Sequence, residues 1–227
     1  MNSKVAVVIP AGGNGSRISK DKKKQFFTHK EKSLLEWSIE PLFSLGDQLK
    51  MIIIAIPEDI DELSQSLLPK HEKIKYCTGG STRQKSVFNG LKFLHSENFE
   101  GTCVVHDAAR PCLDTGKLKN LVEKIQESNE GGVLCVKVAD TVKKANANME
   151  VKNTIDRMNL WYAQTPQGGP FNKLYDANLL AIQEDIVVTD DASILENAGV
   201  PVHIVEDSRS NVKITCVEDW EIFIKNY

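Results

Sequence analysis

Short hydrophobic runs recur along the first two thirds of the chain and predict the strands of a buried sheet. They are rich in valine and isoleucine and almost wholly apolar, which is typical of strands covered on both faces. The predicted strands are residues 5–9, 51–56, 74–77, 103–105 and 133–138. Between them lie segments with helical periodicity, such as the spacing of Val87, Leu91 and Leu94. The predicted helices are residues 33–44, 58–68, 81–94 and 114–128.

Strands that alternate with helices predict an α/β fold with a largely parallel sheet. The pattern changes after Ala139, where residues 140–144 and 150–155 flank the turn-like Asn146-Ala147-Asn148 and predict a projecting β-hairpin, or arm. Further elements are then predicted as helices at 172–183, 191–198 and 217–225 and strands at 202–205 and 212–214. We expect one domain over residues 1–227, with the arm at about 139–160.

Composition narrows the class of protein. The 227 residues are 41% hydrophobic and 26% charged, with a net charge of −3, so neither disorder nor bulk nucleic-acid binding is favoured. The longest apolar run, residues 51–56, is far shorter than the ~20 residues that span a bilayer, and no signal peptide is visible. The five cysteines have no Cys-x-x-Cys spacing, which favours reduced thiols and a cytoplasmic location.

A glycine-rich segment, Pro-Ala-Gly-Gly-Asn-Gly-Ser-Arg at positions 10–17, directly follows the first predicted strand. Its glycines let a ligand approach the backbone, and Arg17 suits phosphate. A plain turn is the alternative, but ligands bind at the carboxyl ends of such strands. The segment is no Walker A loop. It is also a poor dinucleotide fingerprint, because Ile18 stands where the third glycine belongs, so a nicotinamide enzyme is disfavoured.

Further polar motifs follow the other predicted strands. A lysine-rich run at 20–24 follows the glycine loop, a second glycine pair opens residues 79–86, and Asp107 ends a hydrophobic strand, where a carboxylate can hold Mg²⁺. We expect His106 to be a packed histidine rather than a metal ligand. No nucleophile with an adjacent base stands out, so the set favours transfer at phosphorus, in which positioning and charge stabilisation dominate.

Eight motifs in order carry a resemblance to a known family. They are PAGGNGSR (10–17), KQF (24–26), GGSTRQKSV (79–87), VHDAARP (105–111), DRMNLW (156–161), QTPQ (164–167), TDDA (189–192) and NVKIT (211–215). Over nearly its whole length the chain resembles the 2-C-methyl-D-erythritol 4-phosphate cytidylyltransferases of the non-mevalonate isoprenoid pathway. The resemblance implies a Rossmann-like nucleotidyltransferase fold and a homodimer that exchanges its β-arms. It also implies transfer of CMP from CTP to methylerythritol phosphate, with Mg²⁺ and release of pyrophosphate.

The same resemblance implies roles for individual residues. Arg17, Lys24 and Lys213 match the basic residues that stabilise the transition state, and Asp107 matches the metal-linked carboxylate. Positions around the nucleotide are matched by Ala11, Gly12, Gly13, Gly15, Gly80, Ser86 and Ala108. Residues that match the sugar-phosphate site are Arg110, Thr141, Thr189 and Thr215. Arg157 matches a residue that reaches this site from the arm of the partner chain. Lys23 stands where the family usually has proline, so two adjacent lysines are candidates for the one that reaches the phosphates. The spacing from Arg17 favours Lys24.

Two alternatives remain open. A polyol-phosphate cytidylyltransferase, acting for instance on ribitol 5-phosphate, shares the glycine loop and QTPQ but usually has valine at the position of Ala109 and lacks the pattern from Arg157 to Trp161. A non-catalytic nucleotide-binding protein of the same fold should have lost Arg17, Lys24, Asp107 or Lys213, and all four are present.

Overall fold

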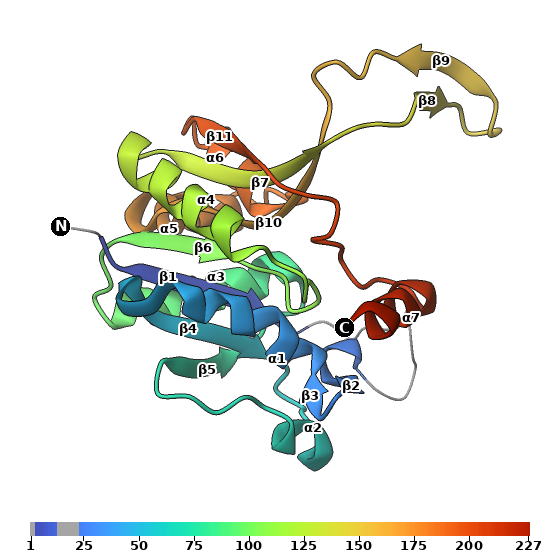
Figure 1. The fold of residues 1–227 in the computed structure, drawn as a ribbon. Coiled ribbons are helices and arrows are strands. Elements are labelled where there is room, and N and C mark those ends of the chain that lie inside the picture. The colour runs from blue at the N-terminus through green and yellow to red at the C-terminus, as the bar shows by residue number, and fades with distance from the viewer. Residues whose placement is uncertain (1–2, 13–22) are drawn as a thin grey trace.

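A seven-stranded sheet forms the centre of the protein in the computed structural model, which describes residues 3–12 and 23–227 (Figure 1). The strand order is β11-β7-β10-β6-β1-β4-β5, and β10 runs antiparallel to both of its neighbours while the other pairs are parallel. The strands are β1 (Val5–Pro10), β4 (Leu49–Ile56), β5 (Ile74–Thr78), β6 (Thr102–Val105), β7 (Gly131–Lys137), β10 (Trp161–Pro170) and β11 (Val202–Glu206). The predicted α/β class with a mostly parallel sheet is confirmed.

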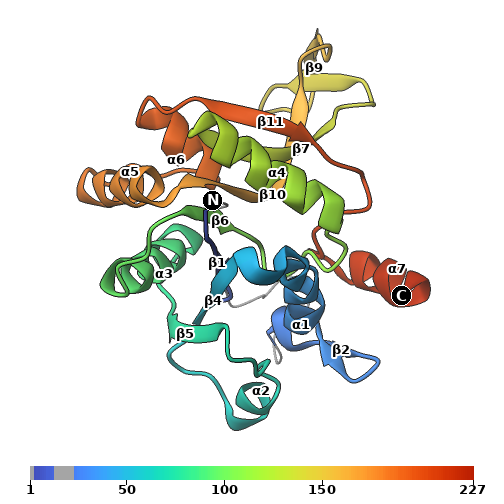
Figure 2. The same cartoon turned by 60° about the vertical axis from the view of Figure 1, so that its left-hand side comes forward.

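Helices cover both faces of this sheet (Figure 2). One face carries α1 (Leu34–Ile39), the 3₁₀ segment η2 (Glu40–Gln48) and α4 (Thr115–Ser128), and the other carries α3 (Arg83–Ser96), α5 (Phe171–Gln183) and α6 (Asp191–Asn197). Successive residues of β1 alternate between the two cores: Val7 packs with α1 and α4, and Val8 packs with α3. Burial on both faces explains why β1 is apolar throughout.

Two predicted helices are shorter in the structure. The helix predicted at 33–44 begins as α1, with Ser33 as its N-cap, but changes to 3₁₀ geometry at Glu40 because Pro41 has no N–H to continue the α-helical ladder. The helix predicted at 58–68 is reduced to α2 (Glu62–Ser66), which starts where Asp61 caps the backbone N–H of Ser64.

The carboxyl-terminal part contains one wrong prediction and one omission. Residues 212–214 form no strand: the backbone N–H of Ile214 donates to the carbonyl of Ala109 at 2.8 Å, and its side chain packs against Leu34 and Phe223. Strand β10 carries the QTPQ motif and was not predicted, because its second half is polar and glycine-rich although it lies at the centre of the sheet. The final helix is confirmed as α7 (Val217–Asn226).

The predicted hairpin is confirmed as β8 (Val142–Ala145) paired antiparallel with β9 (Val151–Ile155). It extends well away from the sheet and helices (Figure 1). Met149 and Met158 are 86% and 73% exposed on it, so apolar side chains face solvent there. Short elements β2 (Thr28–His29), β3 (Lys32–Ser33) and η1 (Lys24–Phe26) complete the amino-terminal part. In the described residues no helix is long and apolar enough to cross a membrane.

Candidate active site

A cleft of about 580 Å³ opens at the carboxyl ends of β1, β4, β5 and β6. These four strands run in parallel, so the loops that follow them meet at one edge of the sheet. The site residues predicted from the sequence that line it are Ala11, Gly12, Lys24, Gly80, Ser86, Asp107, Ala108, Lys213 and Thr215. Gly13, Gly15 and Arg17 were predicted to join them but lie outside the described residues.

The loop after β5 is held closed by Ser86, in the first turn of α3. The Ser86 hydroxyl accepts a hydrogen bond from the N–H of Gly80 at 3.0 Å and donates to the carbonyl of Thr82 at 2.9 Å. A side chain at position 80 would place its Cβ 2.3 Å from the Cβ of Lys85, so this turn requires glycine. Ser86 therefore shapes the cleft wall through the backbone of Gly80.

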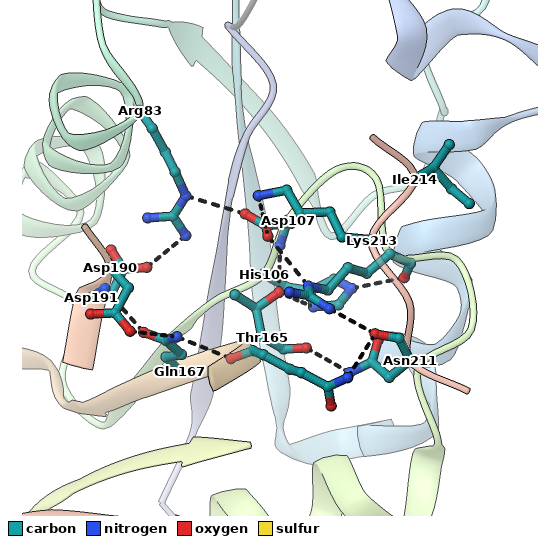
Figure 3. A network of polar contacts seen from close by, with 12 residues as sticks. Arg83, His106, Asp107, Thr165, Gln167, Asp190, Asp191, Asn211, Lys213 and Ile214 are labelled. Atoms are coloured by element: carbon teal, nitrogen blue, oxygen red, sulfur yellow. Dashed lines mark hydrogen bonds and ion pairs between the residues drawn. The ribbon is translucent and has the colours of Figure 1, made fainter. Parts of the chain in front are cut away.

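Three cationic side chains surround Asp107, which lines the cleft, and Figure 3 shows two of them, Arg83 and Lys213. Lys213 Nζ lies 2.9 Å from its Oδ2, Arg83 Nε lies 3.2 Å from its Oδ1, and Arg110 Nε lies 3.4 Å from its Oδ2. Burial alone would raise the pKa of Asp107, but the charges of Arg83, Lys213 and Arg110 outweigh it and hold that pKa well below its usual range. Asp107 is thus a carboxylate at any physiological pH, and the cluster around it carries excess positive charge.

A second set of buried polar groups joins Arg110 and Asp107 to strand β10 through hydrogen bonds. The Arg110 guanidinium donates to the carbonyl of Asn211 at 2.7 Å, and the Asn211 side chain donates to the carbonyl of Thr165 at 2.9 Å. The Thr165 hydroxyl in turn accepts from the N–H of Asp107 at 3.0 Å. Strand β10 therefore links the loop of Asp107 to the segment that carries Lys213.

His106 belongs to the same buried network. Its Nε2 lies 3.2 Å from the carbonyl of Arg110, and its Nδ1 lies 3.2 Å from the hydroxyl of Thr165. The ring must be protonated at Nε2 to donate to that carbonyl, which leaves Nδ1 to accept from Thr165. Burial lowers the pKa of His106 to about 4, so the ring is neutral. The prediction of a packed, hydrogen-bonded histidine is confirmed.

Arg83 and Asp191 were not singled out from the sequence. Besides contacting Asp107, the Arg83 guanidinium donates through Nη2 to Asp191 Oδ2 at 2.7 Å, and Asp191 is only 1% exposed. Burial raises the pKa of Asp191, against the opposing effect of Arg83. The Gln167 side chain accepts from the N–H groups of Asp191 and Ala192 at 3.0 and 2.8 Å. The only sequence signal for this group was its place in the GGSTR, QTPQ and TDDA motifs.

Lys24 and Thr215 reach the cleft from opposite ends of the chain. Lys24 begins η1 and donates to the carbonyl of Ile214 at 2.8 Å. The Thr215 hydroxyl donates to Asp219 Oδ2 at 2.7 Å, just before α7. Burial would raise the pKa of Asp219, but hydrogen bonds from Thr215 and Cys216 prevail and lower it to about 2.

Four predicted sugar-phosphate residues do not line the cleft of this chain. Arg110 lies directly beneath it, in contact with Asp107. Thr189 is exposed on the loop before α6. Thr141 and Arg157 are exposed just before β8 and just after β9, at the same end of this antiparallel hairpin.

A divalent cation bound by Asp107 would need most of its other ligands from a bound substrate or from water. Among the described residues, no three His, Cys, Asp or Glu side chains are grouped closely enough to hold a metal ion. Asp107 Oδ1 has one cationic partner, Arg83, so this oxygen keeps capacity for a further contact. Mg²⁺ commonly binds through one or two carboxylates, with phosphate oxygens and water completing its shell. The arrangement fits a cation that arrives with a polyphosphate.

Comparison with known proteins agrees with this geometry. The family model of 2-C-methyl-D-erythritol 4-phosphate cytidylyltransferase matches residues 5–223. The enzymes of that name from Mannheimia succiniciproducens and Acinetobacter baylyi are 40% and 39% identical to this chain, each over 96% of it and over 93% and 91% of their own lengths.

Solved structures give the same result. The crystal structure of the Francisella tularensis 2-C-methyl-D-erythritol 4-phosphate cytidylyltransferase has a TM-score of 0.83 at 34% identity, covering 99% of this chain and 100% of that one. The 4-diphosphocytidyl-2C-methyl-D-erythritol synthase of Anaerococcus prevotii has a TM-score of 0.83 at 27% identity, covering 99% and 96%. The fold, the ordered motifs and the matches over nearly the full length together show that this chain belongs to the 2-C-methyl-D-erythritol 4-phosphate cytidylyltransferase family.

Proposed function

We propose that this protein transfers CMP from CTP to 2-C-methyl-D-erythritol 4-phosphate and releases pyrophosphate. The observation that carries the proposal is the cluster of Lys213, Arg83 and Arg110 around Asp107, next to a cleft that Lys24 also lines. Both substrates are anionic, so a site that brings them together must offset their mutual repulsion. The cations around Asp107, together with Lys24, would supply that charge.

The reaction needs no general base, because the attacking group is already an anionic phosphate. An oxygen of the acceptor phosphate forms a bond to the α-phosphorus of CTP, while the bond from that phosphorus to the bridging oxygen of the β-phosphate breaks. The electron pair of the broken bond leaves with pyrophosphate. Lys24, Lys213 and Arg17 would stabilise the added negative charge on the α-phosphoryl group. The loops at Gly12 and Gly80 would approach the nucleotide through their backbone.

Mg²⁺ is part of this proposal. Asp107 would hold it together with phosphate oxygens of CTP, and the ion would supply positive charge that lowers repulsion at the triphosphate. Lys213 and Arg83 would keep the Asp107 carboxylate in place from its two sides. Arg110 would do so from beneath the cleft.

The acceptor subsite would be completed by a second copy of the chain. Thr141 and Arg157 are exposed on an arm that extends away from the sheet and helices of its own chain, and the arm carries the exposed apolar residues Met149 and Met158. An exchanged arm in a homodimer would bury those side chains and bring Arg157 to the partner's cleft. Thr189 and Thr215 would meet the acceptor from the body of the chain.

The experiment measures pyrophosphate release with CTP and Mg²⁺, offering methylerythritol 4-phosphate and ribitol 5-phosphate in separate reactions. Release with the first acceptor alone supports the proposal. Release with ribitol 5-phosphate alone would keep the mechanism and refute the acceptor. Binding of CTP without release in either reaction would favour a non-catalytic nucleotide-binding protein.

A further inference from the structure

We propose that Arg83 and Asp191 are positioning residues for the transfer: Asp191 fixes the Arg83 guanidinium, which fixes the carboxylate of Asp107. This inference rests on the proposed function and deepens it: Arg83 appears there only as a contact of Asp107, and Asp191, which holds Arg83, has no role there or in the resemblance. We also expect the Arg83–Asp191 pair to couple two loops. One is the loop at residues 79–82, expected to contact the nucleotide, and the other is the loop before α6, expected to contact the acceptor.

Arg83 is the first residue of α3 and lines the cleft directly after the loop formed by residues 79–82. Its Nε contacts Asp107 Oδ1 at 3.2 Å, and its Nη2 contacts Asp191 Oδ2 at 2.7 Å. The planar fork of arginine gives these two contacts a fixed relative direction, which a lysine ammonium does not. Figure 3 shows Arg83 between the two carboxyl groups. The position of Asp107 is thus tied to that of Asp191.

Asp191 is an unusual side chain to bury, because a carboxylate loses its hydration when it leaves water. It is 1% exposed, and within the described part of the chain its Oδ1 has no hydrogen-bond partner. Its single ion-pair partner there is Arg83. A buried carboxylate that is half satisfied adds little stability compared with an apolar residue. The burial of Asp191 is therefore better explained by its ion pair with Arg83, which holds the guanidinium in position.

Hydrogen bonds also hold the backbone around Asp191 in place. Gln167 on β10 accepts from the N–H groups of Asp191 and Ala192, and its amide donates to Asp190 Oδ2 at 3.1 Å. Asp190 also caps α6 by accepting from the N–H of Ser193 at 3.0 Å. The central sheet thus fixes Asp191, and Asp191 fixes Arg83.

The ion pair joins two loops that have different expected ligands. Thr189, expected at the sugar phosphate, lies two positions before Asp191, and Gly80, expected at the nucleotide, lies three positions before Arg83. Movement of either loop would change the Arg83–Asp191 contact. Occupation of the acceptor side is therefore expected to order the nucleotide side and the Asp107 carboxylate.

Three variants separate positioning from simple support of the fold. Asp191→Asn keeps the shape and removes the charge, and Arg83→Lys keeps the charge and removes the fork. Arg83→Met/Asp191→Leu removes the buried pair together, with Arg83→Met alone as its reference. A matched control is Glu130→Gln, which removes a carboxylate from the 2.6 Å contact with His203 between β7 and β11, outside the cleft. Each variant is measured for thermal unfolding, kcat and KM, and for hydrogen exchange of peptides covering 79–86 and 105–111.

Asp191→Asn and Arg83→Lys are expected to fold, to lose roughly 10²-fold in kcat with a much smaller change in KM, and to exchange faster in both peptides. The double variant is expected to recover stability relative to an Arg83→Met single variant, because Asp191 is no longer left unpaired, yet not to recover turnover. Glu130→Gln should match wild type in kcat.

Recovery of turnover together with stability in the double variant would overturn the proposal, since it would mean that the pair only supports the fold. Unchanged kcat or unchanged exchange of peptide 79–86 in Asp191→Asn would also overturn it. A wild-type protein that releases no pyrophosphate would refute the proposed function instead. The exchange measurement would still decide whether Asp191 orders the segments at 79–86 and 105–111.

Discussion

Lys24 donates a hydrogen bond to the backbone carbonyl of Ile214 at 2.8 Å, although 190 positions separate the two residues in the chain. The contact sets the segment that follows the glycine-rich loop beside the segment that carries Lys213. Two lysines from opposite ends of the sequence therefore line one cleft. Their convergence supplies positive charge where the proposed reaction joins two phosphates.

Replacing Lys24 with methionine should lower kcat by about 10²–10³-fold, the usual effect of removing one charge-stabilising contact in a transition state. The control is Lys23→Met at the adjacent position. Lys23 pairs with the exposed Asp59 at 3.2 Å and does not line the cleft, so its replacement should leave kcat near the wild-type value. Steady-state rates of pyrophosphate release compare the two. The reverse order of effects would assign the catalytic contact to Lys23.

Asp107→Asn should lower the free energy of unfolding by about 1–3 kcal/mol near neutral pH, because Arg83, Lys213 and Arg110 lose their shared counter-charge. The depressed pKa of Asp107 means that its stabilising effect is complete above the ordinary carboxyl pKa of 3.8 and is lost as the pH falls through the lower folded value. Denaturant unfolding should therefore give a constant difference between variant and wild type from about pH 5 to 8. A difference that disappears within that range would contradict the assigned ion pairs.

His106 predicts a separate pH dependence of stability. Its pKa falls from 6.5 to about 4 on folding, so the unfolded chain binds more protons between those values and stability must fall as the pH falls from 6.5 toward 4. One such proton contributes a slope of up to about 1.4 kcal/mol per pH unit. His106→Gln should remove this part of the slope while lowering stability at pH 7. An unchanged slope in the variant would show that the ring is not held neutral.

The proposed arm exchange can be tested by mixing two inactive variants. If Arg157 acts in the partner's cleft, unfolding and refolding Lys24→Met together with Arg157→Ala creates mixed dimers with one intact site. Random pairing then gives roughly a quarter of the wild-type activity. If Arg157 acts in its own chain, or if the protein is monomeric, the mixture remains inactive. Each variant refolded alone serves as the control.

The sheet and its covering helices were largely predictable from the sequence, because strands such as β1 and β4 are buried on both faces and must be apolar. Strand β10 escaped prediction for the opposite reason. Its Gly168 would clash through a Cβ with the carbonyl of Cys103 at 2.0 Å, so close backbone approach selects glycine there instead of a hydrophobic side chain. The alternation at 212–214 reflects burial of Ile214 in a side cluster with Phe223, not pairing in the sheet.

Within the candidate site, residues placed by local sequence pattern could be predicted, and residues placed by long-range packing could not. Asp107 and Gly80 follow strands directly, so their place at the sheet edge could be predicted from local pattern. The contact of Arg83 with Asp191 spans 108 positions and depends on how β10 and α6 pack, which local pattern does not contain. Thr141 and Arg157 lie on an arm whose counterpart is expected on another chain. If the arms exchange as proposed, one folded chain alone does not complete the site of these two residues.

Phosphorus-31 NMR of one reaction mixture follows the proposed transfer of CMP to methylerythritol 4-phosphate itself. CTP, Mg²⁺ and methylerythritol 4-phosphate are incubated with the wild-type protein, and all phosphorus signals are followed together. We expect the monophosphate signal of the acceptor and the triphosphate signals of CTP to decline in step, while a diphosphate diester and pyrophosphate appear in equal amounts. Pyrophosphate that appears with CMP and leaves the acceptor signal unchanged, or CTP that stays intact beside folded protein, would contradict the proposed transfer.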